Sequence, residues 1–136
     1  MRARTPCIWL SAMLLAGCAG MARRDAELSH YLPYAGPPIQ RFSYRTLDNG
    51  WQVVADYKIV MFVGHDAYLL TVVPPCAQMQ LALYMRVSTA IPGSVSRFDR
   101  VLLDDQNCLI DQIQQIDYPR MRRDAEQQQQ AAQKSS

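Results

Sequence analysis

Two short apolar runs around one turn, within residues 58–76, constrain the fold of this chain more than any other feature. The runs 59–63 and 67–73 are rich in Val, Ile, Leu and aromatic residues, and the polar turn 64–66 separates them. Such a pattern is typical of a β-hairpin. Apolar residues stand at neighbouring positions rather than at alternate ones, so both faces of the hairpin should be covered. We therefore expect the hairpin to lie in the middle of a sheet.

Several segments on either side of the hairpin have the composition of strands. Phe42 and Tyr44 alternate with polar residues, which is typical of a half-exposed strand. In residues 109–116 the apolar spacing also fits one face of a helix, but the preceding polar turn and the β-branched content favour a strand. The sequence thus predicts an all-β domain, a small antiparallel sheet of about six strands curled into a barrel or sandwich. The remaining candidate strands are residues 51–55, 83–87 and 95–103.

Length and charge limit the number of domains and argue against one class of function. The chain has 136 residues, which suits one domain rather than two. Its formal net charge is +2, and two of the cations, Arg2 and Arg4, lie in a segment that we expect to be removed. The mature protein is then close to neutral, so we predict that it is not a general electrostatic binder of nucleic acid.

The first residues have the parts of a bacterial secretion signal. Arg2 and Arg4 form a positive start, and residues 8–15 form an apolar stretch that is too short to span a bilayer as a helix. The Leu-Ala-Gly-Cys sequence at residues 15–18 then resembles the lipobox of bacterial lipoproteins, in which small residues precede the cysteine that is lipidated. The alternative is a plain secretory signal that is cleaved elsewhere.

The resemblance to a lipobox implies a shortened and modified mature chain. Residues 1–17 would be removed, and Cys18 would carry the lipid through a thioether. Ala19 stands where an Asp usually retains lipoproteins in the inner membrane, so the resemblance implies an anchor in the outer membrane that faces the periplasm. Several acyl chains, at about 0.8 kcal/mol per buried CH₂, make such an anchor effectively permanent.

A polar segment precedes the predicted β domain, which we place at residues 39–118. Residues 18–38 contain mixed charges and then several prolines, and we expect a tether between the lipid and the domain. The alternative is that Tyr31 and Tyr34 dock on the domain and cover one face of its sheet.

A polar tail, residues 119–136, follows the domain. It carries a run of glutamines and has no apolar stripe, which predicts either a solvated helix or a disordered end. Its arginines could contact anionic lipid, or they could simply be solvated. They are Arg120, Arg122 and Arg123.

Four cysteines are present, and the predicted signal accounts for two of them. Cys7 lies in the segment to be removed and Cys18 is the predicted lipidation site, which leaves Cys76 and Cys108. In an oxidising compartment we expect these two to form a disulfide. A redox-active or metal-binding pair is the alternative, but the chain has no CxxC spacing and only 2 histidines. We therefore predict no metal and no cofactor.

Several short motifs, taken in order, resemble a known family. This order is similar to that of a family of small proteobacterial lipoproteins of unknown function, and the resemblance covers roughly residues 39–118. It implies an all-β domain with a cysteine pair, and it implies no activity, substrate or catalytic residue. The motifs are Trp51, Ala-Tyr-Leu-Leu at 67–70, Pro-Cys at 75–76, Ser-Arg-Phe-Asp at 96–99 and Cys108.

One small group of residues is a candidate binding surface. In a strand over residues 95–103, Arg97 and Asp99 would share one face, where they could bind a carboxylate or phosphate. Tyr68 is a further candidate, because an exposed aromatic ring could stack on a cell-wall sugar, and the alternative is that this tyrosine packs within the sheet. For Arg97 and Asp99, the alternative is a structural ion pair with Phe98 in the core.

These observations predict a non-enzymatic lipoprotein of the outer membrane that binds an envelope protein or peptidoglycan. The first alternative is a small-ligand binder with a pocket near Arg97 and the tyrosines. The second is an enzyme, for which His65, Asp66 and Asp99 would have to converge in space. Because no nucleophile motif accompanies them, we predict no catalytic residue.

Overall fold

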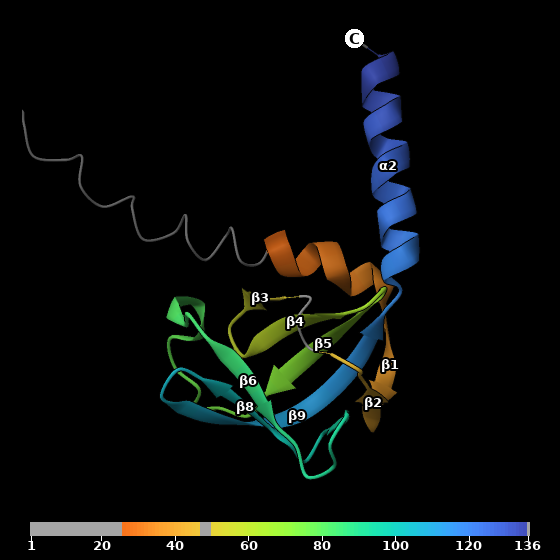
Figure 1. Cartoon of the computed structure of the whole chain (residues 1–136). Coiled ribbons are helices and arrows are strands. Elements are labelled where there is room, and N and C mark those ends of the chain that lie inside the picture. Colours follow the sequence, from red (N-terminus) through yellow and green to blue (C-terminus); the bar gives the residue numbers. More distant parts are fainter. Residues whose placement is uncertain (1–25, 47–49, 136) are drawn as a thin grey trace, which may run out of the picture.

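The computed structural model describes residues 26–46 and 50–135. Their strands form a curled antiparallel sheet, a half-barrel, with a short helix on its outer face and a longer helix that projects from it (Figure 1). The predicted all-β fold class is confirmed. The predicted signal and Cys18 lie outside the described residues.

The helices and strands follow one another closely along the chain. Residues 26–31 are helical, and we call them the N-terminal helix. The 3-10 helices are η1 (Leu32–Tyr34) and η2 (Met79–Leu81), and the long helix is α2 (Tyr118–Lys134). The strands are β1 (Ala35–Ile39), β2 (Arg41–Ser43), β3 (Trp51–Ala55), β4 (Lys58–Val63), β5 (Asp66–Val72), β6 (Met85–Ser88), β7 (Ser94–Ser96), β8 (Arg100–Leu103) and β9 (Gln106–Ile116).

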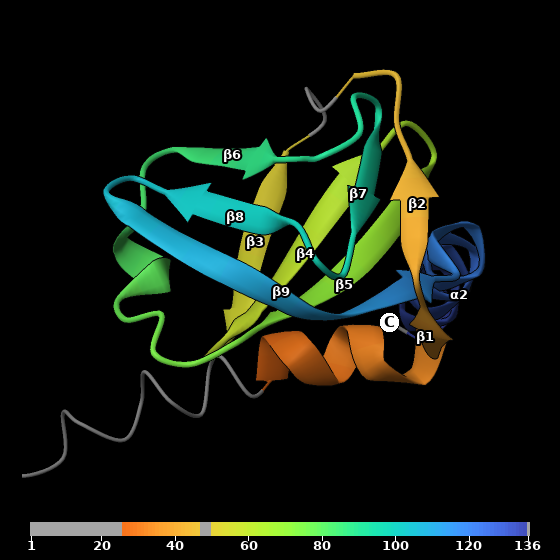
Figure 2. The same cartoon turned by 90° about the horizontal axis from the view of Figure 1, so that it is seen from below.

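Strand β9 organises the large sheet, which has 7 strands. The strand order is β3-β4-β5-β9-β8-β6, and β1 also pairs with β9. With 11 residues, β9 is long enough to pair with β5 along one edge and with β8 and then β1 along the other. The sheet curls around this strand, and the separate pair β2–β7 lies beside it (Figure 2).

The central hairpin forms as predicted. β4 and β5 pair along their whole length, and Val63 lies opposite Asp66, so Gly64 and His65 form a two-residue turn. Gly64 has a φ of 62°, a left-handed conformation that glycine adopts without steric cost. The hairpin lies between β3 and β9, in the middle of the sheet.

The main core fills the concave side of the sheet. β2 and β7 contribute Phe42 and Val95 to it, and the ring of Phe42 stacks on Tyr68 of β5 with 3.9 Å between centroids. The two small strands therefore close the open side of the half-barrel. Side chains that are no more than 1% exposed in this core include Ile59, Leu70, Val72, Val101, Leu103, Ile110 and Ile113.

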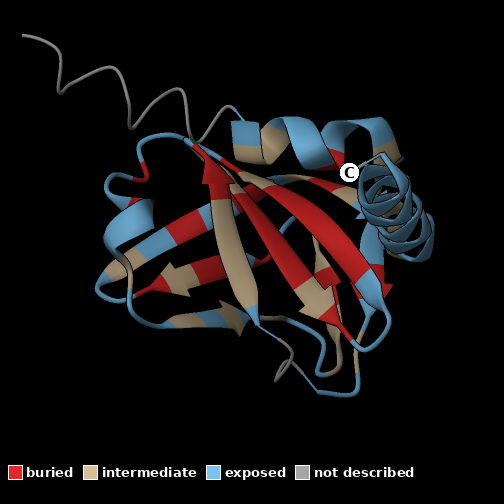
Figure 3. Ribbon diagram, turned by 90° about the horizontal axis from the view of Figure 1, so that it is seen from above, coloured by how far each residue is buried: buried red, intermediate tan, exposed pale blue. Residues whose placement is uncertain are grey.

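A second apolar cluster, the outer cluster, covers the other side of the hairpin. Val60 and Leu69 are fully buried there, beneath the N-terminal helix and the start of α2 (Figure 3). Tyr31 of the N-terminal helix packs into this cluster, and its hydroxyl donates a hydrogen bond of 3.1 Å to the Gln52 side-chain oxygen. Both faces of the hairpin are therefore covered, as the sequence predicts.

The structure distinguishes the two alternatives for the described part of residues 18–38. Tyr31 is buried and Tyr34 packs against the outer cluster, which is the docked alternative. β1 also belongs to the sheet, with Ala35 opposite Ile116 of β9. The sheet thus includes residues that the sequence assigned to a tether. Because β1 contains two prolines, the sequence does not predict it as a strand. Prolines are nevertheless tolerated in an edge strand, where no N–H donor to the ladder is needed.

The prediction of one strand over residues 95–103 is wrong. The structure has two strands there, β7 and β8, with a turn between them. The Asp99 carboxylate closes this turn by accepting hydrogen bonds from the backbone N–H of Ser96 at 2.6 Å and of Ala90 at 2.9 Å. Such side-chain bonds to the backbone compete with a strand ladder. Arg97 and Asp99 therefore do not share a strand face.

The predicted disulfide is present between Cys76 and Cys108. Their Cα atoms are 5.9 Å apart, and both residues are only 3% exposed. The bond joins the segment after β5 to β9 across 32 positions of sequence. In the chain-entropy model, closing a loop of this length stabilises the fold by about 3.5–4 kcal/mol.

The polar tail forms a helix, one of the two forms predicted for it. Asp117 caps the start of α2 by accepting a hydrogen bond of 3.2 Å from the backbone N–H of Arg120. None of the 17 residues of α2 is buried, and Tyr118 and Met121 pack against the outer cluster. At about 1.5 Å per residue the helix is roughly 25 Å long, and most of it extends away from the sheet (Figure 1).

Candidate functional site

The predicted binding residues Arg97, Asp99 and Tyr68 occupy three different environments. Tyr68 lies in the main core, where burial raises the pKa of its hydroxyl and the nearby Asp66 adds to that rise. Asp99 is buried in the turn between β7 and β8, and Arg97 is exposed to solvent. The structure therefore does not assemble these residues into one site.

The Asp99 carboxylate is occupied by hydrogen bonds from backbone N–H groups in and near its turn. Burial by itself raises the pKa of its carboxyl, but the hydrogen bonds from the backbone of Ala90 and from Ser96 lower it, and the charge of Arg41 adds to the lowering. The donors prevail, so the pKa lies below the ordinary value of 3.8. Asp99 therefore has a structural role, but its partners are backbone donors and not the ion pair with Arg97 that the structural alternative expected.

Phe98 is 74% exposed, which corrects its expected place in the core. The guanidinium of Arg97 lies over its ring, 5.1 Å from the centroid. A cation–π contact of this kind at an exposed position contributes about 0.5–1 kcal/mol. The pair forms a small surface feature at the tip of the β7–β8 turn.

The acid–base set considered for an enzyme does not converge. His65 lies near the end of β9, because Ala67 is opposite Ile116 in the ladder. Asp99 lies beside Ile110, whose backbone N–H donates to its carbonyl at 3.0 Å. Six strand residues at about 3.3 Å each separate the two positions by roughly 20 Å. The two side chains cannot share a proton-transfer path in this structure.

The described ranges contain neither a metal-ligand cluster nor a membrane-spanning helix. No group of three or more His, Cys, Asp and Glu side chains there could hold a metal ion. No helix in the same ranges is long and apolar enough to cross a membrane. The candidate sites are instead two surface hollows.

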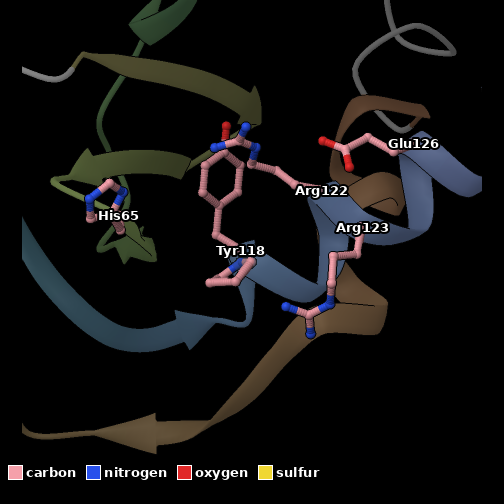
Figure 4. Close-up of a pocket in the computed structure, with 6 residues that line it drawn as sticks. His65, Tyr118, Arg122, Arg123 and Glu126 are labelled. Carbon is pink, nitrogen blue, oxygen red and sulfur yellow. The ribbon is translucent and has the colours of Figure 1, made fainter.

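The first hollow lies between the β4–β5 turn and the start of α2, and we call it the α2 hollow. Its volume is about 360 Å³. Figure 4 shows His65 on the side of the turn and the other labelled residues on α2. The lining combines an aromatic ring, two cations, one anion and a histidine. It consists of His65, Tyr118, Pro119, Arg122, Arg123 and Glu126.

The three arginines near the start of α2 differ in their partners. The side chain of Arg120 approaches the Asp124 carboxylate at 4.0 Å and lies 5.7 Å from the ring centre of Tyr34. The Tyr34 hydroxyl donates to Asp124 at 2.8 Å, and this hydrogen bond raises the pKa of the hydroxyl. Arg122 and Arg123 have no hydrogen bond or ion pair with any described residue, and both line the α2 hollow.

The second hollow lies beside β6 and has a volume of about 620 Å³. β6 is the last strand in the sheet order, and among residues 26–46 and 50–135 only β8 pairs with it, so we call its other edge the free edge. Three large apolar residues in the segment just before β6 are exposed, and we call them the 81–84 patch. They are Leu81 at 65%, Leu83 at 78% and Tyr84 at 75% exposed.

A carboxylate holds the 81–84 patch in place. Asp104, in the turn between β8 and β9, accepts hydrogen bonds from the backbone N–H of Leu83 at 3.2 Å and of Tyr84 at 2.9 Å. The backbone N–H of Asp104 donates in return to the Tyr84 carbonyl at 3.2 Å. The backbone of the patch is therefore fixed while its side chains face solvent.

Sequence reasoning identified neither hollow. The sequence places Leu83 in a strand, and a short apolar run of this kind is normally attributed to the core. The only signal for an exposed patch was the density of large apolar residues around the polar Gln80. The α2 hollow joins His65 to side chains more than 50 positions later in the chain, and sequence spacing carries no signal of that contact.

The residues that the structure describes form a small β half-barrel with a disulfide between Cys76 and Cys108, helices on its outer side and open hollows beside α2 and β6. The chain belongs to a Family of unknown function (DUF6491), which matches residues 1–134. Membership of a family of unknown function agrees with the resemblance described from the sequence. Neither a curated protein nor a solved structure matches the chain.

Proposed function

We propose that this protein is a non-enzymatic lipoprotein, anchored through Cys18 in the outer membrane, whose β domain faces the periplasm and binds an envelope protein. The observation that carries the proposal is the free edge of β6 beside the 81–84 patch. The anchor rests on the lipobox resemblance at residues 15–18. On this proposal the family is one of proteobacterial lipoproteins, as the order of motifs from Trp51 to Cys108 implies.

The free edge of β6 supports the binding of an extended partner segment. An unpaired strand edge presents N–H and C=O groups that can pair with another chain. Soluble proteins usually block such edges with Lys, Pro, bulges or a covering element. β6 has the sequence Met-Arg-Val-Ser, with one charge and no proline. Its edge is therefore suited to accept a strand.

The 81–84 patch supports a partner with apolar side chains. Single exposed apolar residues are ordinary on a protein surface, whereas several that lie together mark an interaction site. Leu83 and Tyr84 are both at least 75% exposed and directly precede the free edge. A strand that pairs with β6 would lie next to them, so backbone pairing and apolar burial would act together.

The disulfide and the chain length support the proposed location. A buried disulfide in a small domain is expected of an exported protein, because cytosolic thiols are kept reduced. Eight positions separate Cys18 from residue 26, where the described chain begins, and eight residues span at most about 28 Å. A lipid on Cys18 would hold the N-terminal helix within that distance of the membrane.

Site-specific photo-crosslinking in intact cells tests the partner. A crosslinking amino acid replaces the exposed Arg86 of β6, and the adduct is identified by mass spectrometry and reconstituted from the two purified proteins. We expect one discrete protein adduct. The variant Leu83→Lys places a charge in the patch and should weaken binding at least tenfold, about 1.4 kcal/mol. Phe98→Lys, at an equally exposed position on another turn, is the matched control and should bind normally.

Two outcomes would contradict the proposal. Equal loss of binding in Leu83→Lys and Phe98→Lys would show that the β6 edge is not the specific surface. Cosedimentation of the protein with purified peptidoglycan, abolished by Leu83→Lys and with no protein adduct at Arg86, would replace the protein partner by the cell wall. The exposed Tyr84 ring would then act as a platform for a sugar.

A further inference from the structure

Two arginines border the α2 hollow without an ion pair to any described residue. Arg120, one turn of helix away, is held by Asp124 and Tyr34. Arg122 and Arg123 carry the same group on the same helix, but they border the hollow and have no hydrogen bond or ion pair in the described part of the chain. Both arginines border the hollow, but their guanidinium groups point apart in Figure 4, so one phosphate contacts both only when one of these long side chains turns toward the other.

Tyr118, which lines the hollow, is held in position by its packing against the outer cluster. The Tyr118 ring packs against Phe62 of β4, with 5.3 Å between centroids and 57° between ring planes. Pro119 follows within the first turn of α2, and the Asp117 cap fixes where the helix begins. Arg122 and Arg123 therefore project from a helix turn whose direction is set by packing against the sheet.

The charges around the hollow favour one class of ligand. The planar guanidinium group of arginine presents several N–H donors in a geometry that matches phosphate oxygens, and such bonds are among the strongest in proteins. Glu126 also borders the hollow, and its negative charge offsets the positive charge of one arginine. The two arginines and this carboxylate therefore carry a combined charge of +1. His65, on the opposite side, adds a ring nitrogen that can meet the same ligand.

We propose that the α2 hollow binds the phosphate group of a phosphate ester through Arg122 and Arg123. A volume of about 360 Å³ accommodates a phosphate together with a small attached group, at the lower end of the range for ligand sites. The phosphate belongs either to a lipid headgroup at the membrane surface or to a soluble ester. The site is separate from the β6 edge, and its test does not depend on the protein partner.

Two binding measurements on the purified full chain separate the sources. The first is a calorimetric titration with glycerol 1-phosphate, and the second is a calorimetric titration with short-chain phosphatidylglycerol dispersed as monomers, with short-chain phosphatidylcholine as the control, because a lipid on Cys18 would itself carry the protein to any vesicle. Binding in the first measurement assigns a soluble ester, and binding that requires phosphatidylglycerol assigns a lipid headgroup. Either result supports the proposal, whereas the absence of binding in both overturns it.

Three variants test the residues. The double variant Arg122→Gln with Arg123→Gln should weaken binding at least tenfold, because two charge-assisted contacts are lost. Arg120→Gln removes one positive charge from the same helix and should change the affinity less than about twofold, since Arg120 already has its partner. Glu126→Gln should strengthen binding, because it removes the carboxylate that repels the phosphate.

The outcomes of the variants are distinguishable from a general charge effect or a folding defect. A loss in Arg120→Gln as large as in the double variant would mean unspecific attraction and would overturn the site. Unchanged or weaker binding in Glu126→Gln would overturn the assignment of the ligand as an anion in this hollow. All four substituted residues are exposed, so the thermal transition of each variant should match that of the wild type.

Discussion

Asp99 shows how one side chain can redirect the chain. Its carboxylate accepts the backbone N–H of Ser96 and of Ala90, and this ends β7 where the apolar pattern would continue it. The backbone carbonyl of the same residue accepts the N–H of Ile110 at 3.0 Å, which attaches the turn to β9. Asp99 is therefore a residue of the fold, and Arg97 beside it is free to face solvent.

We predict that Asp99→Asn destabilises the protein by about 1–3 kcal/mol, measured by chemical denaturation. The amide retains the shape of the carboxylate but turns one acceptor into a donor, which then faces a backbone N–H. Asp105→Asn, at an exposed position in the next turn, is the control and should change stability by less than about 0.5 kcal/mol. Equal stabilities of the two variants would show that the Asp99 hydrogen bonds contribute nothing.

The lowered pKa of Asp99 predicts how its contribution depends on pH. A carboxyl whose pKa is lower in the folded state stabilises the fold above its ordinary value of 3.8, and this stabilisation is lost as the pH falls through the folded value. The difference in unfolding free energy between wild type and Asp99→Asn should be constant near neutral pH and should shrink below about pH 4. A difference that grows on acidification would contradict the lowered pKa.

Tyr31 offers a second prediction at the scale of a residue. Tyr31→Phe removes only the hydrogen bond to Gln52 and should cost about 0.5–1.5 kcal/mol of unfolding free energy. Tyr31→Ala also removes the ring that packs into the outer cluster, and it should cost about 3 kcal/mol or more. If the two variants were equally stable in urea denaturation, the N-terminal helix would not be docked as the structure has it.

At the scale of elements, the strands with clear apolar patterns could be predicted and those fixed by other interactions could not. The bounds of β3 agree with the predicted residues 51–55, and both strands of the hairpin form over the two nearly continuous apolar runs. The prolines of β1 are typical of a tether, so the sequence does not predict this strand. The sequence predicts β7 and β8 as one strand, because the turn between them depends on the buried carboxylate of Asp99, whose backbone partners the sequence does not reveal.

The candidate surfaces could not be predicted for a related reason. Exposure of Leu83 and Tyr84 depends on the Asp104 carboxylate, which holds their backbone from 20 or more positions away. The α2 hollow lies where the start of the helix meets the β4–β5 turn, and there Tyr118 of the helix contacts Phe62 of β4. Both are tertiary contacts, and neither leaves a periodic signal in the sequence.

The distal part of helix α2 should contribute little to the stability of the domain. Truncation after Glu126 removes residues that have no buried side chain, so the unfolding free energy should change by less than about 0.5 kcal/mol. Tyr118→Ala, in contrast, removes the contact with Phe62 and should cost about 1–2 kcal/mol. Strong destabilisation by the truncation would mean that the distal part of α2 packs on the domain.

At the scale of the whole molecule, the two proposed binding surfaces lie on different parts of the half-barrel. The N-terminal helix and the start of α2 cover the outer side of the β4–β5 hairpin, whereas β6 is an end strand of the sheet order (Figure 1). In the proposed orientation the side covered by the two helices is close to the lipid anchor, and the β6 edge is left accessible. A phosphate site near the anchor and a partner edge away from it can then be occupied together.

The disulfide should be a major source of stability for the domain. We predict that the double variant Cys76→Ala with Cys108→Ala unfolds with about 3–4 kcal/mol less free energy than the oxidised wild type, because the loop across 32 positions is no longer closed. Addition of a reductant should bring the wild type to the same value in urea denaturation. An unchanged value after complete reduction would show that the bond does not contribute.

The intact mass of the protein recovered from its native membrane fraction tests the central claim most directly. The account predicts a chain that begins at Cys18, carries a diacylglyceryl thioether and an additional acyl group there, and is lighter by two hydrogens because Cys76 and Cys108 are joined. An unmodified chain of 136 residues with four free thiols, recovered from the cytosol, would contradict it.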